Sequence, residues 1–185
     1  MNNALDSESS NRRNVVVVRQ AIPTDADAIA DVYCRCWRET YTGLLPDSLI
    51  DDVADPDDAR EQWRKRLEPG LGFHAAVAEI PHGPVVGFAT GGAIRDLLLD
   101  HDAELTALYL LRRHHGYGVG RQLMNAMMAG LTGDGFQSMV ALVLSTNPAV
   151  AFYQAMGGKE VARQNREFRG VMVDERVFAW TLNGR

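Results

Sequence analysis

The stretch ELTALYLLRRHHGYGVGRQLM, residues 104–124, decides the fold of this 185-residue chain. Residues 105–111 are almost all apolar, which is typical of a strand that is covered on both faces. Three glycines follow, and from Val119 onward the apolar residues recur at helical spacing. The stretch therefore predicts a strand, a glycine-rich turn and a helix.

The turn before this helix is suited to holding phosphate. A glycine-rich loop at a helix N-terminus presents unpaired backbone N–H groups and the positive end of the helix dipole. Basic side chains flank it: Arg112, Arg113, His114, His115 and Arg121. The spacing fits neither a Rossmann fingerprint, whose first glycine directly follows the strand, nor a P-loop, which requires Lys-Ser/Thr after its last glycine.

Length and composition indicate a single globular domain. Hydrophobic residues make up 46% of the chain and charged residues 23%, which are ordinary values. The net charge of −5 argues against a general nucleic-acid-binding protein. No apolar run is long enough to span a membrane and the start of the chain lacks a signal-peptide core, so we expect a cytoplasmic protein with neither nucleic-acid nor membrane partners.

The two cysteines, Cys34 and Cys36, are expected to be ordinary reduced residues. Positions i and i+2 of a helix point in different directions, so these side chains cannot readily form a disulfide with each other. With no paired histidine spacing nearby, we expect no metal site.

The chain divides into a disordered tail, residues 1–13, and one domain, residues 14–185. Thr24 is expected to cap the first helix, with Asp27 completing a capping box. Asn147 is expected to cap the last helix, with Pro148 at its first position. Strands are predicted over 15–19, 73–80, 84–94, 105–111, 138–144, 159–167 and 175–182. Helices are predicted from 24 toward a break at Gly43, and over 47–52, 56–67, 119–132 and 147–156.

Three segments resemble the GNAT superfamily of N-acetyltransferases. Residues 115–120 resemble its acyl-CoA loop, Gln/Arg-x-x-Gly-x-Gly/Ala, with His115 at the Gln/Arg position. Residues 147–157 resemble its Asn-x-x-Ala-x-x-Phe-Tyr-x-x-x-Gly segment, with the alanine either one place late at Ala151 or replaced in register by Val150. Residues 37–46 resemble the segment between the first two helices of many bacterial members. The resemblance implies an α/β (α+β) single domain: a mixed, mostly antiparallel sheet of about seven strands, about four helices and a parallel βαβ unit that binds acyl-CoA.

The resemblance also implies a reaction, the transfer of an acetyl group from acetyl-CoA to a primary amine by direct attack in a ternary complex, without a metal. Leu108 and Leu110 would pair with the pantetheine arm through their backbones, and Asn147 would contact the cofactor or serve only as a helix cap. The remaining expected cofactor-binding residues belong to the loop: Arg113, His115, Gly116, Tyr117, Gly118, Val119, Gly120 and Arg121. For Arg113 and Arg121 the alternative is a solvated basic surface.

Four further residues could each have either a functional or a structural role. By resemblance Glu104 is a general base, and otherwise a surface carboxylate at a strand end. Tyr153 is the general acid for the leaving thiolate, or a core aromatic residue. Trp37 and Tyr41 line the acceptor pocket, where aromatic rings suit an amine, or they belong to the core.

The acceptor is expected to be a small molecule, because neither a second domain nor an extended basic surface is present to dock a macromolecule. The resemblance allows a homodimer. Two alternatives remain: an acyl-CoA-binding sensor or interaction module without transferase activity, and, less favoured by the loop spacing, a nucleotide-binding protein.

Overall fold

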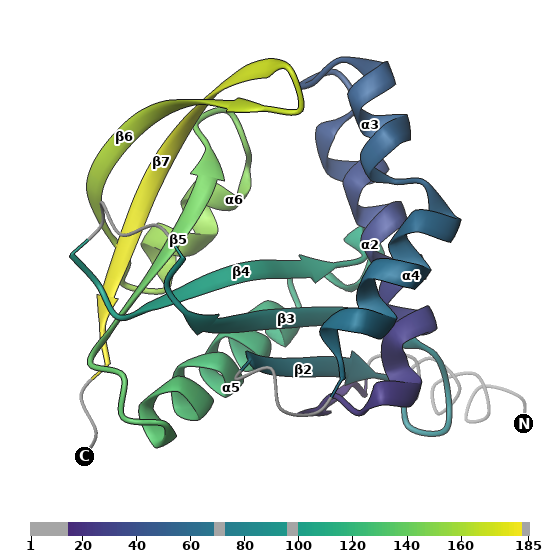
Figure 1. Ribbon diagram of the computed structural model, residues 1–185. Coiled ribbons are helices and arrows are strands. Elements are labelled where there is room, and N and C mark those ends of the chain that lie inside the picture. Colours follow the sequence, from purple (N-terminus) through teal and green to yellow (C-terminus); the bar gives the residue numbers. More distant parts are fainter. Residues whose placement is uncertain (1–14, 69–72, 96–99, 183–185) are drawn as a thin grey trace, which may run out of the picture.

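The computed structural model describes residues 15–68, 73–95 and 100–182 (Figure 1). The predicted tail, residues 1–13, lies outside the described residues, as do Pro69 and Gly70, where the sequence indicates an end to the helix predicted over 56–67.

The described residues form one seven-stranded sheet in the order β1-β2-β3-β4-β5-β7-β6. β4 and β5 are its one parallel pair within the part of the chain that the structure describes, and the other pairs are antiparallel. This confirms the predicted mixed sheet and its βαβ unit. The strands are β1 (Val17–Gln20), β2 (Phe73–Glu79), β3 (Val85–Ala93), β4 (Ala103–Leu110), β5 (Ser138–Leu144), β6 (Lys159–Phe168) and β7 (Val171–Thr181).

Five α-helices are present in the described residues, where about four were expected. They are α2 (Ala26–Tyr41), α3 (Asp47–Val53), α4 (Pro56–Arg66), α5 (Val119–Gly133) and α6 (Ala149–Ala155), and single 3-10 turns cover Pro23–Asp25 and Arg112–His114. The short α3 corresponds to the helix predicted over 47–52, and Ala54 and Asp55 separate it from α4. None of the helices in the described ranges is long and apolar enough to cross a membrane.

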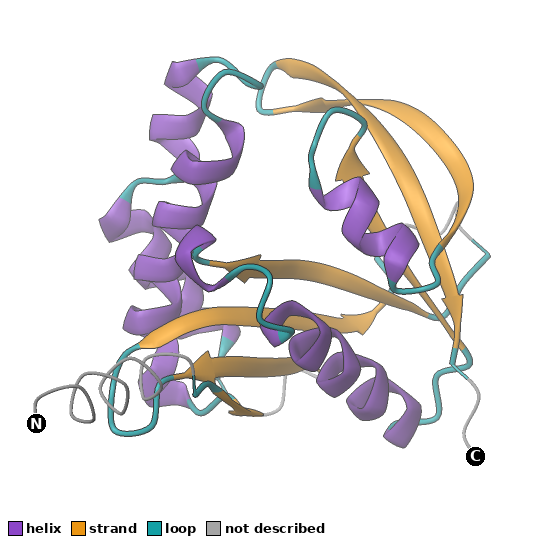
Figure 2. Ribbon diagram, turned by 180° about the vertical axis from the view of Figure 1, so that it is seen from behind, coloured by secondary structure: helices purple, strands orange, loops and turns teal. Residues whose placement is uncertain are grey.

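Helices cover both faces of the sheet formed by β2, β3 and β4 (Figures 1 and 2). An added Cβ at Gly130 of α5 would meet the His74 ring, whereas Trp63 of α4 packs edge-on against Phe88, with ring centroids 4.9 Å apart. Phe88 is opposite Val77 in the ladder, and Val77 is an odd number of residues from His74, so Phe88 and His74 lie on opposite faces. Trp63 is 2% exposed, as expected for a core residue.

The predicted start of the first helix is wrong in its capping. Pro23 fixes φ and begins a 3-10 turn before α2, so Thr24 lies inside this turn. The side chain that accepts a backbone hydrogen bond here is Asp25. Its carboxylate accepts the Ile22 N–H at 2.8 Å and forms an ion pair with Arg19 at 2.7 Å. The Arg19 hydrogen bond lowers the pKa of Asp25.

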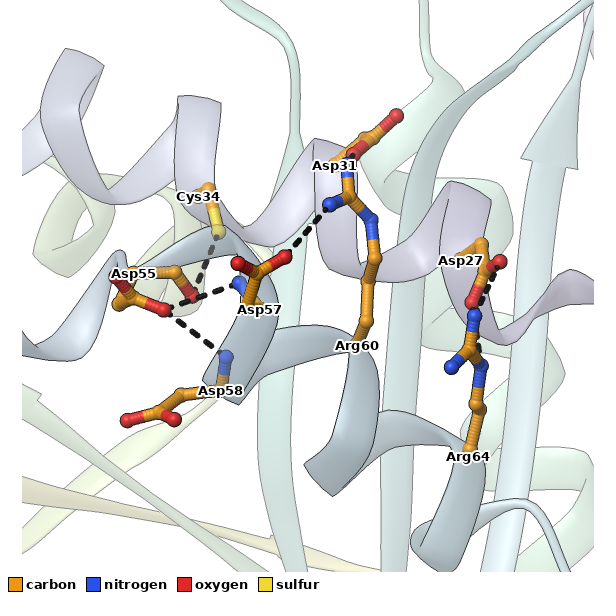
Figure 3. Close-up of polar contacts among 8 residues, drawn as sticks. All are labelled: Asp27, Asp31, Cys34, Asp55, Asp57, Asp58, Arg60 and Arg64. Atoms are coloured by element: carbon orange, nitrogen blue, oxygen red, sulfur yellow. Dashed lines mark hydrogen bonds and ion pairs between the residues drawn. The ribbon is translucent and has the colours of Figure 1, made fainter.

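Asp27, the other member of the predicted capping box, pairs with α4 instead. Figure 3 shows Asp27 and Asp31 of α2 facing Arg64 and Arg60 of α4, with guanidinium–carboxylate distances of 2.8 and 3.1 Å. Asp55 caps α4 by accepting the Asp57 and Asp58 N–H groups at 3.0 Å. These contacts fix the position of α2, which supplies one wall of the site described below.

The two cysteines are both free, as predicted, and both are buried. The Cys34 thiol contacts the Asp55 carbonyl at 3.8 Å (Figure 3). Burial raises the pKa of the Cys36 thiol to about 12, so it is protonated at neutral pH.

Arg169 and Gly170 form the turn between β6 and β7, and both residues have positive φ, 47° and 79°. Because such a turn matches the twist of a hairpin, β6 and β7 stay paired up to it, and β7 begins at Val171 rather than at residue 175. The tip of this hairpin reaches α3 (Figure 1), where Arg169 ion-pairs with Asp52. Phe168 stacks on Trp37 of α2, with centroids 6.2 Å apart.

Candidate functional site

The site begins where β4 and β5 separate. Their ladder contains only the pairs Ala103–Met139 and Glu104–Val140, although both strands continue beyond it, and the two halves of the sheet diverge from there (Figure 1). A cavity of about 800 Å³ lies along the unpaired part of β4, lined by residues 106–110 of β4, by Leu142 and Val143 of β5 and by α6. The edge of β4 is therefore available to an extended ligand.

A β-bulge interrupts β4 at this cavity. The register with β3 shifts so that Thr90 pairs with Ala107 and Gly91 with Leu105, which leaves Thr106 without a partner in that ladder. The Thr106 hydroxyl compensates by contacting the Thr90 hydroxyl at 2.8 Å and donating to the Thr90 carbonyl at 3.2 Å. Bulges leave backbone groups unpaired beside a site, which suits Thr106 for contact with a ligand.

The glycine-rich loop forms one end of the cavity. Gly116 and Gly118 have φ of 81° and 80°, a backbone conformation that other residues rarely adopt, and Gly118 is the N-cap of α5 without a capping side chain. Gly120 has a different role, because an added Cβ would lie 3.3 Å from the Phe152 ring of α6. All three glycines line the cavity next to the N–H groups of the first turn of α5.

Other residues of the predicted loop set lie elsewhere. Val119 is buried in the core, and the Tyr117 side chain is 58% exposed and lies outside the cavity lining. Arg113 is also outside the lining, and its guanidinium donates to the imidazole of His114 at 3.1 Å. Arg121 lines the cavity.

His115 lines the cavity and bonds back to the strand before the loop. Its Nε2 lies 2.7 Å from the Leu110 carbonyl oxygen. Leu108 and Leu110 line the same cavity from β4. The structure thus brings these predicted cofactor-binding residues together.

Tyr153 lies on α6 in the wall of the cavity and is 7% exposed. Its ring packs against Phe178 and Trp180, with centroids 6.0 and 5.7 Å away. Burial raises its pKa, so the phenol stays protonated well above neutral pH. Tyr153 therefore packs in the core and presents a proton donor at the cavity.

Tyr41 and Asn147 stand in the same wall. Burial raises the pKa of Tyr41, while hydrogen bonding with Tyr109 and Asn147 opposes this effect. The Asn147 Oδ1 accepts the N–H of Ala149, the first residue of α6, at 2.8 Å, but the N-cap of α6 is Pro148 and not Asn147 as predicted. Asn147 thus bonds to both α6 and Tyr41 in the lining of the cavity.

Two predicted residues are not among those that line the cavity. Glu104 lies where β4 and β5 are still paired, and its carboxylate is 14% exposed and 3.2 Å from the Arg95 guanidinium. Trp37 is 7% exposed and packs on Tyr41, with centroids 4.3 Å apart, behind the lining.

Several lining residues were missed by sequence reasoning. Thr106 and Tyr109 carried a signal, since they are the hydroxyl-bearing residues of an otherwise apolar strand. Glu39 and Arg112 also line the cavity, and they bond to each other. The Arg112 N–H donates to the Glu39 carboxylate at 2.9 Å, and the Arg112 guanidinium donates to the Glu39 carbonyl. No sequence pattern indicated this pair, because the two residues are 73 positions apart. The described residues hold no cluster of three or more His, Cys, Asp or Glu placed to bind a metal.

Comparison with known proteins agrees with this geometry. The acetyltransferase (GNAT) family model matches residues 26–157. The chain is 34% identical over 166 residues to the N-acetyltransferase YuaI of Bacillus subtilis, covering 90% of this chain and 93% of YuaI. It is 29% identical over 156 residues to the phosphinothricin N-acetyltransferase of Streptomyces viridochromogenes, covering 80% and 76% of the two chains.

Solved structures share the fold. The acetyltransferase yncA from Salmonella typhimurium, determined with its cofactor acetyl-CoA, superposes with a TM-score of 0.69 at 24% identity, covering 92% of this chain and 96% of that one. Because the family model spans most of the domain and YuaI aligns along nearly its whole length, this chain belongs to the acetyltransferase (GNAT) family.

Proposed function

We propose that this enzyme acetylates the primary amine of a small molecule by direct attack on acetyl-CoA in a ternary complex. The observation that carries the proposal is the cavity itself, which runs from the glycine-rich loop along the open edge of β4 to Tyr41 and Tyr153. One continuous cavity thus adjoins a loop suited to binding phosphate, the unpaired edge of β4 and the phenol of Tyr153.

The residues present fit acetyl-CoA. The loop N–H groups beside Gly116 and Gly118 would hold its pyrophosphate, where a Cβ would be strained. The unpaired edge of β4 at Leu108 and Leu110 would bond the pantetheine amides as a neighbouring strand does. The bulge at Thr106 would offer a backbone group near the thioester.

Tyr153 would complete the chemistry of the leaving group. The amine nitrogen attacks the thioester carbonyl carbon, the C–S bond breaks and the sulfur leaves with the electron pair. The Tyr153 hydroxyl, kept protonated by burial, would donate its proton to that sulfur and regain one from solvent.

An ammonium must lose a proton before it can attack. We propose Glu104 as the carboxylate that accepts this proton. Because its side chain lies outside the cavity lining, the proton would travel through water from the far end of the cavity.

Two features support a small acceptor. The proposed acceptor side of the cavity is lined by the aromatic residues Tyr41 and Tyr109, which suit a small amine. One relative is named for acting on a small molecule, phosphinothricin. Cytoplasmic location and a homodimer belong to the same proposal, and size-exclusion chromatography with light scattering would test the latter.

The deciding experiment is a thiol-release assay with acetyl-CoA and a panel of amines: amino acids, amino-acid amides, polyamines and peptides with free N-termini. Product mass must rise by one acetyl group. Saturable turnover of a small amine supports the proposal, and turnover of peptides alone would move the acceptor to a protein. Tight acetyl-CoA binding without turnover of any amine would favour the non-catalytic acyl-CoA-binding module.

A further inference from the structure

His115 is held in one tautomer by the strand that precedes its loop. Its Nε2 lies 2.7 Å from the Leu110 carbonyl oxygen. A carbonyl oxygen only accepts hydrogen bonds, so Nε2 must carry a hydrogen. In the neutral imidazole the other ring nitrogen, Nδ1, is then a bare acceptor.

A bare acceptor is unsuited to phosphate. The imidazole lines the cavity immediately before Gly116 and Gly118, where the proposed function seats the pyrophosphate. A phosphate oxygen offers only lone pairs, so a neutral His115 has no donor left for it and its Nδ1 lone pair is repelled. The doubly protonated ring has a second N–H and a positive charge, and it keeps the bond to Leu110.

We infer that His115 binds the pyrophosphate of acetyl-CoA only as the imidazolium, through Nδ1–H, so that cosubstrate binding takes up a proton. This inference rests on the proposed placement of acetyl-CoA. It makes His115 a binding residue whose contribution to acetyl-CoA affinity depends on pH.

Ionisable groups from several elements flank His115 in the chain or line the same cavity. From its own segment His115 is flanked by Arg112, Arg113 and His114, and from α5 the cavity receives Arg121. From α2 the facing ionisable groups are Glu39, whose carboxylate already accepts the Arg112 N–H, and Tyr41 and Cys36, which burial keeps neutral. From β4 and α6 they are Tyr109 and Tyr153, also neutral. A dianionic pyrophosphate would add negative charge beside the ring, which favours the imidazolium.

Proton uptake can be measured without knowing the acceptor amine. The probe is dephospho-CoA, which keeps the pyrophosphate but lacks the 3′-phosphate that itself titrates near neutrality. Calorimetric titration in two buffers of different ionisation enthalpy gives the number of protons taken up on binding. The wild type should take up a substantial fraction of a proton near pH 7, and its Kd should rise about three- to tenfold from pH 6 to pH 8.

Two variants separate the imidazole from its surroundings. His115→Gln can still donate to the Leu110 carbonyl but does not titrate, so it should take up no proton and show a flat Kd at the weaker, high-pH level. His115→Arg carries its charge throughout and should bind tightly at both pH values without proton uptake. His114→Gln, checked for folding by thermal melting, is the matched neighbouring control and should behave as the wild type.

Wild-type binding without proton uptake, or uptake that persists in His115→Gln, would overturn the inference while leaving the cosubstrate site intact. Failure of both CoA and dephospho-CoA to bind at any pH would instead overturn the proposed placement of acetyl-CoA, and the role of His115 with it.

Discussion

Glu39 and Arg112 each satisfy a backbone group of the other. The Glu39 carboxylate accepts the Arg112 N–H at 2.9 Å, and the Arg112 guanidinium donates to the Glu39 carbonyl. That carbonyl belongs to the last turn of α2, whose carbonyls lack helical partners, and Arg112 begins the 3-10 turn that leads to the glycine-rich loop. The pair therefore joins the helix on the acceptor side to the loop on the cofactor side.

Glu39→Ala should weaken the contact between α2 and the segment that leads to the glycine-rich loop. The variant leaves the Arg112 N–H without its acceptor, so we expect the free energy of unfolding to fall by about 0.5–1 kcal/mol and acetyl-CoA affinity to fall about threefold. Glu39→Gln keeps an acceptor oxygen and should retain most of both. Urea denaturation and calorimetric titration measure the two effects.

The control for this variant is Glu61→Ala, which removes an exposed carboxylate paired with Lys65 on α4, away from the cavity. It should change neither measurement appreciably. If Glu39→Ala had the same acetyl-CoA affinity as Glu61→Ala, the contact between Glu39 and Arg112 would serve stability alone and not cosubstrate binding.

Tyr153→Phe should separate catalysis from binding. The ring contacts with Phe178 and Trp180 remain, so folding and acetyl-CoA affinity should be preserved, while kcat falls about 10²-fold because the leaving thiolate loses its proton donor. Since burial raises the pKa of Tyr153, its deprotonation should not limit the wild-type rate anywhere up to pH 10. Steady-state kinetics across pH check both statements.

The control for Tyr153→Phe is Tyr117→Phe, which removes an exposed phenol in the glycine-rich loop, outside the cavity lining. It should leave kcat unchanged. A wild-type rate in Tyr153→Phe would remove Tyr153 as the acid and leave it as a packing residue.

The sequence predicted the elements and the loop because both depend on local patterns. Apolar periodicity separates strands from helices, and the alternating glycines at 116 and 118 indicate positive φ and a helix start. The cap of α2 was wrong because Asp25 is held by Arg19 on β1, and no local pattern reveals that contact. The position of Glu104 outside the cavity lining likewise follows from where β4 and β5 part, which is a property of the whole sheet.

Glu104→Gln tests the proposed base. If a proton leaves toward Glu104, the variant should lower kcat about 10²-fold, with the KM for acetyl-CoA unchanged. Glu39→Gln is the matched comparison, because it neutralises the carboxylate that does line the cavity. If kcat fell more in Glu39→Gln than in Glu104→Gln, the carboxylate that removes the proton would be Glu39 on α2 and not Glu104 on β4.

Gly118→Ala should weaken cosubstrate binding more than it weakens the fold. At φ of 80° an alanine is strained by about 1 kcal/mol, yet nothing lies within 4 Å of the added Cβ, so the protein should still fold. That empty space is where the proposed pyrophosphate would lie, and acetyl-CoA affinity should fall about tenfold. Gly133→Ala, at the far end of α5, also meets nothing within 4 Å but has no positive φ, so it should leave affinity unchanged. Equal affinity in the two variants would show that phosphate is held away from Gly118, and the cosubstrate would then have to enter the cavity by another end.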